Sequence, residues 1–266
     1  MLAGPPRRAI DVPAVVKVLA AGRSIHAIWE NQLGGLTFEV AGGTDRHFIK
    51  WAPAGSPLDL NAEAIRLSWA AAFTQVPHVL DYGDDETGTW LITGPVPGET
   101  ATSERWKRAP AIAVAAIGEG LRAFHDALPV DRCPFSWSAN DRLADARHRA
   151  SLGWLAPAAW HSDHQRLTVD QALDELADIP SIDHTVVCHG DACAPNTLLT
   201  EDGQWSGHVD LGAMGIADRW ADLAIATWST EWNYGPGLED RLLAAYGVPA
   251  DPEHTRYYRL LWDLGP

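Results

Sequence analysis

The sequence predicts an α+β protein of two lobes, in which a small antiparallel β lobe with one helix precedes a mostly helical lobe. Short apolar runs rich in β-forming residues are concentrated in the first 93 residues. Longer patterns with helical periodicity fill most of the remaining chain. Between these parts lies Gly94-Pro95-Val96-Pro97-Gly98, which breaks regular structure. We therefore expect lobes at 1–93 and 99–266, joined by a hinge at 94–98.

The first lobe is expected to contain a helix at 12–21, followed by irregular sequence. Segments 35–40 and 46–51 form a predicted hairpin around a turn at 42–45. Ser56-Pro57 predicts the start of a helix that runs to Phe73, because Ser is a good N-cap and Pro suits a first turn. Its expected buried stripe consists of Ile65, Trp69 and Phe73. Two more strands are expected at 76–81 and 89–93.

The second lobe is expected to be built from amphipathic helices. The periodicity places them at 110–127, 138–150, 164–179, 220–230 and 254–261. His125, on the first of these helices, is interpreted as a packed core residue.

Composition restricts the partners and the compartment. The net charge of −15 argues against nucleic acid, whose phosphates it would repel. It is compatible with a cationic small molecule, although an acidic surface that serves only solubility is the simpler explanation of the charge alone. We expect no membrane partner, because no run of 18 apolar residues occurs, and the start of the chain lacks the apolar segment of a signal peptide. Three cysteines, an odd and small number, suit a reducing cytoplasm.

The stretch from His189 to Gly212 carries the chemistry. It begins with His189-Gly190-Asp191, reaches Asn196 after four intervening residues, and ends with Asp210-Leu211-Gly212. Asp-Gly between two apolar runs predicts a hairpin, which would bring Asn196 and Asp210 to face each other. Their amide and carboxylate oxygens suit Mg²⁺, and Asp191 adds a carboxylate that can orient an attacking hydroxyl. Each triplet taken alone could equally be turn residues around an ordinary hairpin.

The same spacing occurs in the catalytic loop of kinases, although Gly190 and Leu211 replace the Arg and Phe of protein kinases. With these departures, the run HGDACAPN followed by DLGxxGIADRWADLA resembles the aminoglycoside phosphotransferase family. The resemblance covers most of the chain and is strongest over 189–226. It implies a two-lobed, protein-kinase-like fold with a nucleotide-binding first lobe and a catalytic, aminoglycoside-binding second lobe, in which Asp222 braces the catalytic loop. The cofactors that it implies are Mg²⁺ and ATP, or another nucleoside triphosphate.

The resemblance implies specific roles for individual residues. Asp191 would be catalytic and touch the acceptor hydroxyl, and Asn196 and Asp210 would hold the metal. Lys50, in an apolar strand, would contact the inner phosphates and be steadied by Glu63; a lysine facing water at a sheet edge and an exposed helical glutamate are the alternatives. The other expected nucleotide-binding residues are Gly34, Gly35, Thr93, Gly94 and Val96.

The acceptor is expected to be a cationic aminoglycoside, bound by Asp191 together with Glu231, Trp232 and Asp263. LPVDRCPF, VVCHGDACAPN and the ending WDLGP, which lacks an acidic-aromatic tail, resemble the streptomycin 3″-phosphotransferase branch. Alternatives are a 3′-phosphotransferase of the kanamycin or neomycin type, a kinase for another amino-alcohol or peptide antibiotic, and a nucleotide-binding pseudokinase. The sequence leaves the oligomeric state open, with a monomer expected.

Overall fold

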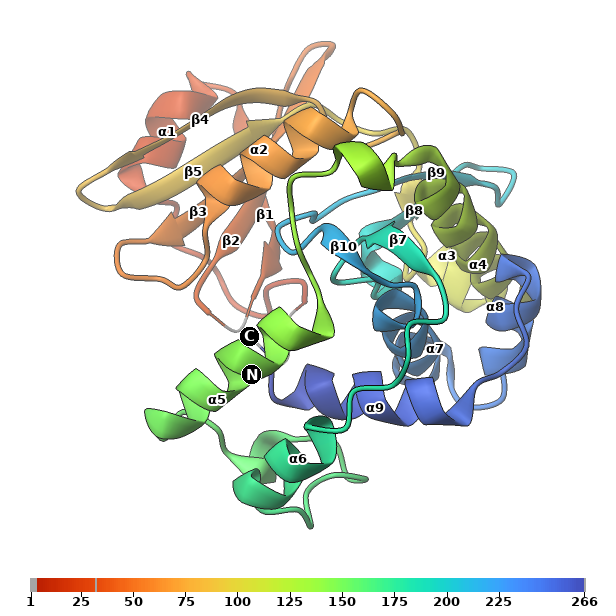
Figure 1. Cartoon of the computed structure of the whole chain (residues 1–266). Helices are drawn as coiled ribbons and strands as arrows, with labels where there is room; N and C mark the ends of the chain where they lie inside the picture. Colours follow the sequence, from red (N-terminus) through yellow and green to blue (C-terminus); the bar gives the residue numbers. More distant parts are fainter. Residues whose placement is uncertain (1–3, 32, 266) are drawn as a thin grey trace. The chain divides into compact units, whose positions relative to one another are not determined.

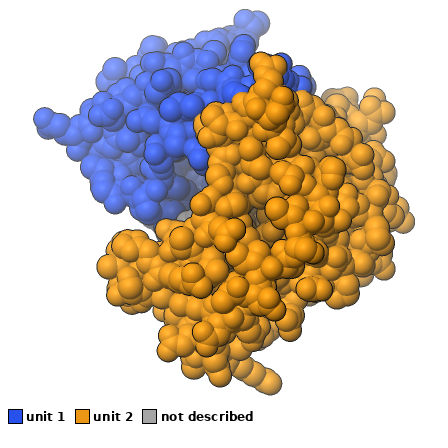
Figure 2. All heavy atoms as spheres, viewed as in Figure 1, with its two compact units in different colours: residues 1–97, 208–212 blue, residues 98–207, 213–266 orange. Residues whose placement is uncertain are grey.

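The computed structural model describes residues 4–31 and 33–265 (Figure 1). The chain divides into two compact units, coloured blue and orange in Figure 2. Unit 1 comprises the chain up to Pro97 together with His208–Gly212, and unit 2 comprises Gly98–Gly207 and Ala213–Pro266. The first boundary falls within the expected hinge segment. The segment 208–212 groups with unit 1, although the sequence analysis assigned it to the second lobe.

Unit 1 is a five-stranded antiparallel sheet in the order β1-β2-β3-β5-β4, with helix α1 (Ala14–Ala20). The predicted hairpin is confirmed, since Phe38 pairs with Ile49 between its two strands and both side chains are fully buried. Val16 and Ala20 of α1 join them in one apolar cluster. The expectation of irregular sequence after the first helix is wrong, because this segment forms β1. The strands are β1 (Ser24–Glu30), β2 (Leu36–Gly42), β3 (Asp45–Pro53), β4 (Val79–Asp85) and β5 (Gly88–Thr93).

The predicted start and stripe of the helix after β3 are wrong. Helix α2 (Leu60–Ala70) begins after Asp59, whose side chain accepts a hydrogen bond from the Ala62 amide. The expected stripe failed because Ile65 is 54% exposed. The helix instead buries another face, whose residues are spaced three and four apart, which is the spacing of one helix face. These buried residues are Leu60, Glu63, Ala64, Leu67 and Ala70.

Unit 2 is mostly helical, as expected. The amphipathic pattern predicts α4 correctly at both ends, whereas α6 is shorter than expected and α7 continues one further turn. The short helices α3 and α8 were not predicted. Within the part of the chain that the structure describes, no helix has both the length and the apolar character needed to cross a membrane. The helices are α3 (Glu104–Lys107), α4 (Pro110–Ala127), α5 (Ala139–Ser151), α6 (Val169–Leu176), α7 (Trp220–Tyr234), α8 (Glu239–Tyr246) and α9 (Pro252–Asp263).

Two small sheets flank the segment 189–196, which we call the HGD loop. Strand β7 (Thr185–Cys188) leads into this loop and pairs with β10 (Gly215–Asp218). A second sheet has the order β6-β8-β9, with β6 (Glu99–Thr100), β8 (Thr197–Leu199) and β9 (Trp205–His208). The predicted hairpin across Asp202-Gly203 is therefore confirmed. The loop is thus held between β7 and β8, and each of these strands pairs with other strands.

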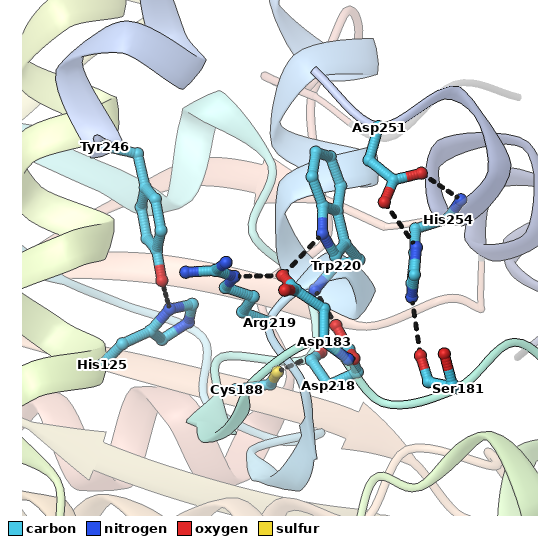
Figure 3. Close-up of polar contacts among 10 residues, drawn as sticks. All are labelled: His125, Ser181, Asp183, Cys188, Asp218, Arg219, Trp220, Tyr246, Asp251 and His254. Carbon is cyan, nitrogen blue, oxygen red and sulfur yellow. Dashed lines mark hydrogen bonds and ion pairs between the residues drawn. The ribbon is translucent and has the colours of Figure 1, made fainter. Parts of the chain in front are cut away.

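A polar network fixes the start of α7 (Figure 3). The Asp183 carboxylate accepts hydrogen bonds from Arg219 Nε at 2.6 Å and from the Trp220 indole at 3.0 Å. Asp218 accepts from the backbone amides of Trp220 and Asp183. Because these groups bond to one another across β10 and the segment before β7, they fix where α7 begins.

His254 links α9 to the chain before β7. Its Nδ1 lies 2.8 Å from Asp251 Oδ2 and its Nε2 lies 2.9 Å from the Ser181 carbonyl oxygen (Figure 3). Burial by itself would lower the pKa of His254, but the Ser181 carbonyl and the Asp251 carboxylate outweigh it and raise the pKa above its ordinary value. Both partners are acceptors, so they favour the doubly protonated ring.

The raised pKa of His254 leads to a test of stability against pH. The contribution of this group is fully present below its unfolded pKa and is lost as pH rises through the folded pKa. In urea unfolding, His254→Gln should therefore lower the midpoint more at pH 6 than at pH 8.5. An equal loss of midpoint at both pH values would contradict the assignment.

Candidate active site

Lys50 is the centre of the polar cluster in unit 1. Its ammonium donates to Glu63 Oε1 at 2.6 Å and to Asp210 Oδ1 at 2.9 Å. Strand alternation explains its direction, because Ile49 faces the apolar core and the next side chain must point to the other face of the sheet. Glu63 comes from the buried face of α2. The structure thus unites a strand lysine, a helix glutamate and the aspartate of Asp210-Leu211-Gly212.

The charges of this cluster depend on one another. Burial by itself would lower the pKa of Lys50, but the carboxylates of Asp210 and Glu63 raise it above its ordinary value. Burial raises the pKa of Glu63, and the Lys50 ammonium opposes that shift. The Glu63 side chain is 5% exposed and the Asp210 side chain is 45% exposed. Lys50 therefore compensates a buried carboxylate on one side and reaches an accessible one on the other.

Asp210 has an unusual backbone. Its φ of +67° lies in the left-handed region, which a non-glycine residue adopts at a cost and often at functional sites. The segment that carries it is attached to unit 1, since the His208 amide donates to the Gln75 carbonyl at 3.3 Å. This backbone directs the Asp210 carboxylate toward Lys50.

A small cavity of about 60 Å³ opens beside Lys50. Its lining includes Gly35, Thr37, Leu58 and Asp210. A Cβ added at Gly35 would lie 2.5 Å from a Leu58 methyl carbon, so a larger residue there would require the Leu58 side chain to move. Gly34, with a φ of +82°, precedes it in the same turn. The turn chemistry accounts for both glycines without a ligand, and their role toward phosphate stays a prediction.

The other predicted nucleotide-binding residues lie at the end of β5. Thr93 pairs with Phe48 and Val79, and the Gly94 amide donates to the His78 carbonyl at 2.8 Å. Val96 is buried. Because the Gly94 amide is engaged in this way, we expect the Gly94 carbonyl or the backbone of Val96 to bind the nucleotide base. Their role stays a prediction.

In unit 2, hydrogen bonds hold the HGD loop at several points. Gly190 has a φ of +86°, and a Cβ there would lie 2.3 Å from the Ala213 carbonyl oxygen, so only glycine fits. The Asn196 side chain donates through Nδ2 to the Asp191 carbonyl at 3.0 Å. The Ala194 amide donates to Ser229 Oγ, on α7, at 2.9 Å. These contacts fix the backbone on both sides of the Asp191 side chain.

Asp222 is the main partner of this loop. It is fully buried on α7 and accepts from the His189 amide at 2.6 Å and the Gly190 amide at 2.9 Å. Burial by itself would raise the pKa of Asp222, but His125, His189 and the Gly190 amide lower it overall. The carboxylate is therefore ionised at neutral pH. The sequence predicts a packed position for His125 but not this contact, because the two residues lie far apart in the chain.

The predicted metal ligands suit Mg²⁺ by their chemistry. An amide oxygen and a carboxylate are hard oxygen donors, and the Nδ2 contact of Asn196 leaves the side-chain oxygen as the ligand atom. Among the described residues, His125, Cys188 and Asp222 also have ligand atoms within 4.8 Å of one another. That group is fully enclosed and its atoms serve hydrogen bonds within the protein. Asn196 and Asp210 therefore remain the predicted ligands.

The residues predicted to bind substrate lie at the ends of α7 and α9. Glu231 is exposed, and Trp232 is 47% exposed and packs on Trp228 with ring centroids 5.2 Å apart. Asp263 Oδ2 accepts from the His161 amide at 3.1 Å and from His164 Nδ1 at 2.6 Å. Asp263 thus orders the loop before α6. The sequence analysis missed both histidines, because no motif marks them.

The strand lysine with its helix glutamate, and the ordered Asp191, Asn196 and Asp210, define a phosphotransferase with a kinase-like fold. Residues 30–260 match the phosphotransferase enzyme family, and the chain belongs to that family. It is a transferase.

Relatives of known activity cover nearly the whole chain. The chain is 35% identical to an aminoglycoside 3′-phosphotransferase of Streptomyces fradiae, over 89% of this chain and 93% of that protein. It is 31% identical to a streptomycin 3″-kinase of Streptomyces griseus, over 87% and 89%. Aminoglycoside phosphotransferase APH(3″)-Id of Streptomyces rimosus, solved with ADP and streptomycin, has a TM-score of 0.75 and 28% identity, covering 96% of this chain and 99% of that one.

The Lys50 cluster leads to a prediction about stability. Lys50→Met leaves Glu63 buried without its cation, which should cost about 3 kcal/mol at pH 8. Burial then raises the pKa of Glu63 unopposed, so the penalty should shrink toward pH 5, where the protonated form is stable. Asp210→Asn is the matched control, with an expected cost below about 1 kcal/mol because this partner is accessible. Urea unfolding at the two pH values checks both; a penalty for Lys50→Met that is independent of pH would contradict the prediction.

Proposed function

We propose that this protein transfers the γ-phosphoryl group of ATP to a hydroxyl of a cationic aminoglycoside antibiotic and thereby gives resistance to it. The main observation in support of this proposal is the Lys50–Glu63–Asp210 cluster, in a chain that also orders Asp191 and Asn196 in its HGD loop. Membership of the phosphotransferase family and relatives that act on aminoglycosides support the reaction class and the acceptor. The net charge of −15 suits a polycation.

Each residue has a proposed role in the transfer. Lys50, steadied by Glu63, contacts the inner phosphates. Asp191 accepts a hydrogen bond from the acceptor hydroxyl and orients it for attack in line with the leaving oxygen. Asn196 and Asp210 hold Mg²⁺, which supplies charge neutralisation on the phosphates when bound. Most of the rate comes from positioning and electrostatics, because phosphoryl transfer needs little covalent help from the protein.

The first lobe, 1–93, is proposed to bind the nucleotide and the second, 99–266, to hold the catalytic and acceptor residues, with 94–98 as the hinge. The turn at Gly34 and Gly35 would cover the phosphates, and Thr93, Gly94 and Val96 would meet the base.

For the acceptor we propose the 3″-hydroxyl of streptomycin. The LPVDRCPF and VVCHGDACAPN runs support this choice, as does the similarity to a neighbour solved with streptomycin. Exposed Glu231 beside Trp232 offers a carboxylate and a ring to a planar guanidinium group. The rival is a 3′-hydroxyl of the kanamycin or neomycin type, which the higher identity to a 3′-phosphotransferase favours.

The role of Asp191 is tested by Asp191→Asn. The variant should keep ATP binding and lose about 10²–10⁴ in kcat, the range for a lost general base. ADP release in a coupled assay gives kcat, and calorimetric titration with ATP gives binding. Turnover near the unmodified level would remove Asp191 from the reaction.

The acceptor is tested by ADP release with streptomycin, kanamycin and neomycin at equal concentration, followed by NMR to locate the phosphate. Streptomycin should be the best substrate, with phosphate on the 3″-hydroxyl. Glu231→Gln should raise KM for streptomycin about fivefold, the effect of an accessible ion pair, and leave KM for ATP unchanged. Efficient turnover of kanamycin with phosphate on its 3′-hydroxyl would establish the rival.

A further inference from the structure

Three consecutive backbone amides lead up to the side chain of Asp191, and each has a partner in unit 2. The His189 and Gly190 amides donate to the two oxygens of Asp222, at 2.6 Å and 2.9 Å. The Asp191 amide donates to Nδ1 of His189 at 3.2 Å. The orientation of the Asp222 carboxylate therefore decides the orientation of the peptide planes before Asp191.

Asp222 is itself oriented by a chain of two further side chains. His125 Nε2, on α4, lies 2.9 Å from Asp222 Oδ2, and Tyr246 Oη, at the end of α8, lies 2.8 Å from His125 Nδ1. An ionised carboxylate only accepts, so Nε2 carries the proton, and Nδ1 is the ring atom that bonds with the tyrosine hydroxyl. Figure 3 shows the hydroxyl of Tyr246 directed at the His125 ring.

The hydrogen-bonded group of Tyr246, His125 and Asp222, which we call the relay, is buried between packed helices. His125 is 4% exposed and Tyr246 is 2% exposed. Helix α8 lies close against α4, since a Cβ added at Gly118 would be 2.4 Å from the Leu242 carbonyl oxygen. The relay is therefore set by helix packing, and water does not replace its hydrogen bonds.

A buried metal is the competing interpretation, because Cys188 joins His125 and Asp222 in a group with ligand-like spacing. The Cys188 thiol donates to the Asp218 carbonyl at 3.3 Å, which requires its proton. Burial raises the pKa of this thiol well above its ordinary value, whereas a metal ligand must be a thiolate. The hydrogen-bonded relay accounts for the group without an ion.

We infer that Tyr246 and His125 are positioning residues for phosphoryl transfer, acting through Asp222 on the backbone that carries Asp191. The inference rests on the proposed role of Asp191. Transfer requires the acceptor oxygen in line at close range, and small displacements of the orienting group cost large factors in rate. Without the tyrosine hydroxyl, Nδ1 of His125 loses its partner. The ring is then less restrained, and so is the hydrogen bond from its Nε2 to Asp222.

The first experiment compares Tyr246→Phe with Tyr257→Phe. Tyr257 is a matched control, since it is buried in the same unit and its hydroxyl donates to the Leu176 carbonyl at 3.2 Å, away from the HGD loop. Both variants should lose a similar, small amount of thermal stability. Only Tyr246→Phe should lose kcat, about 10-fold, as when an outer hydrogen-bond partner of a functional group is removed. KM for ATP and for streptomycin should stay unchanged.

The second experiment uses a conservative rescue at His125. His125→Gln keeps an N–H in reach of Asp222, whereas His125→Leu leaves the carboxylate without this donor. Gln should therefore retain more kcat than Leu at matched folded concentration. If Leu fails to fold, the tyrosine pair still decides the matter.

A double-mutant cycle separates failure of this inference from failure of the proposed function. In an Asp191→Asn background, adding Tyr246→Phe should cause no further loss in kcat, because the relay acts through Asp191. If Asp191→Asn alone keeps full turnover, the proposed function falls. If Asp191→Asn is impaired but Tyr246→Phe behaves like Tyr257→Phe, raises KM alone, or lowers kcat equally in both backgrounds, the relay is overturned.

Discussion

The organisation of unit 2 depends on the hydrogen bonds that the buried carboxylate of Asp222 accepts. A charge without water is stable only when every lone pair finds a donor, and here the donors come from the HGD loop and from α4. The same residue sits in the first turn of α7, where the helix dipole favours a negative charge. The loop, α4 and α7 therefore cannot move independently without leaving that charge unpaired.

In unit 1 the central charge is a cation, the ammonium of Lys50, and its partners are carboxylates. Lys50 lies between a buried carboxylate and an accessible one, so its ammonium has one partner that is enclosed and one that solvent reaches. A ligand phosphate could compete with Asp210 for this ammonium while Glu63 keeps its partner. The two clusters thus differ in exposure, since the Asp222 carboxylate is fully buried and that of Asp210 is accessible.

Local sequence patterns predicted an element correctly where neighbouring residues determine its structure. Proline at the first position and a clean amphipathic period predicted α4, and Asp202-Gly203 predicted its hairpin. The stripe of α2 was wrong because the large apolar residues Ile65 and Trp69 are not on its buried face, which includes a glutamate and two alanines. Strand β1, the His125–Asp222 contact and the hold of His161 and His164 on Asp263 depend on partners distant in sequence. Spacing within one motif carries no information about such partners.

The assignment of His208–Gly212 to unit 1 has a consequence for how this gene could be recombined. Unit 1 is discontinuous, so a fragment ending at Pro97 would contain Lys50 and Glu63 without Asp210. A chimera that exchanged only the first 97 residues with a relative would pair one parent's lysine with the other parent's aspartate. Exchange of unit 1 as a whole therefore takes three crossovers, one at the hinge and two around the Asp-Leu-Gly segment.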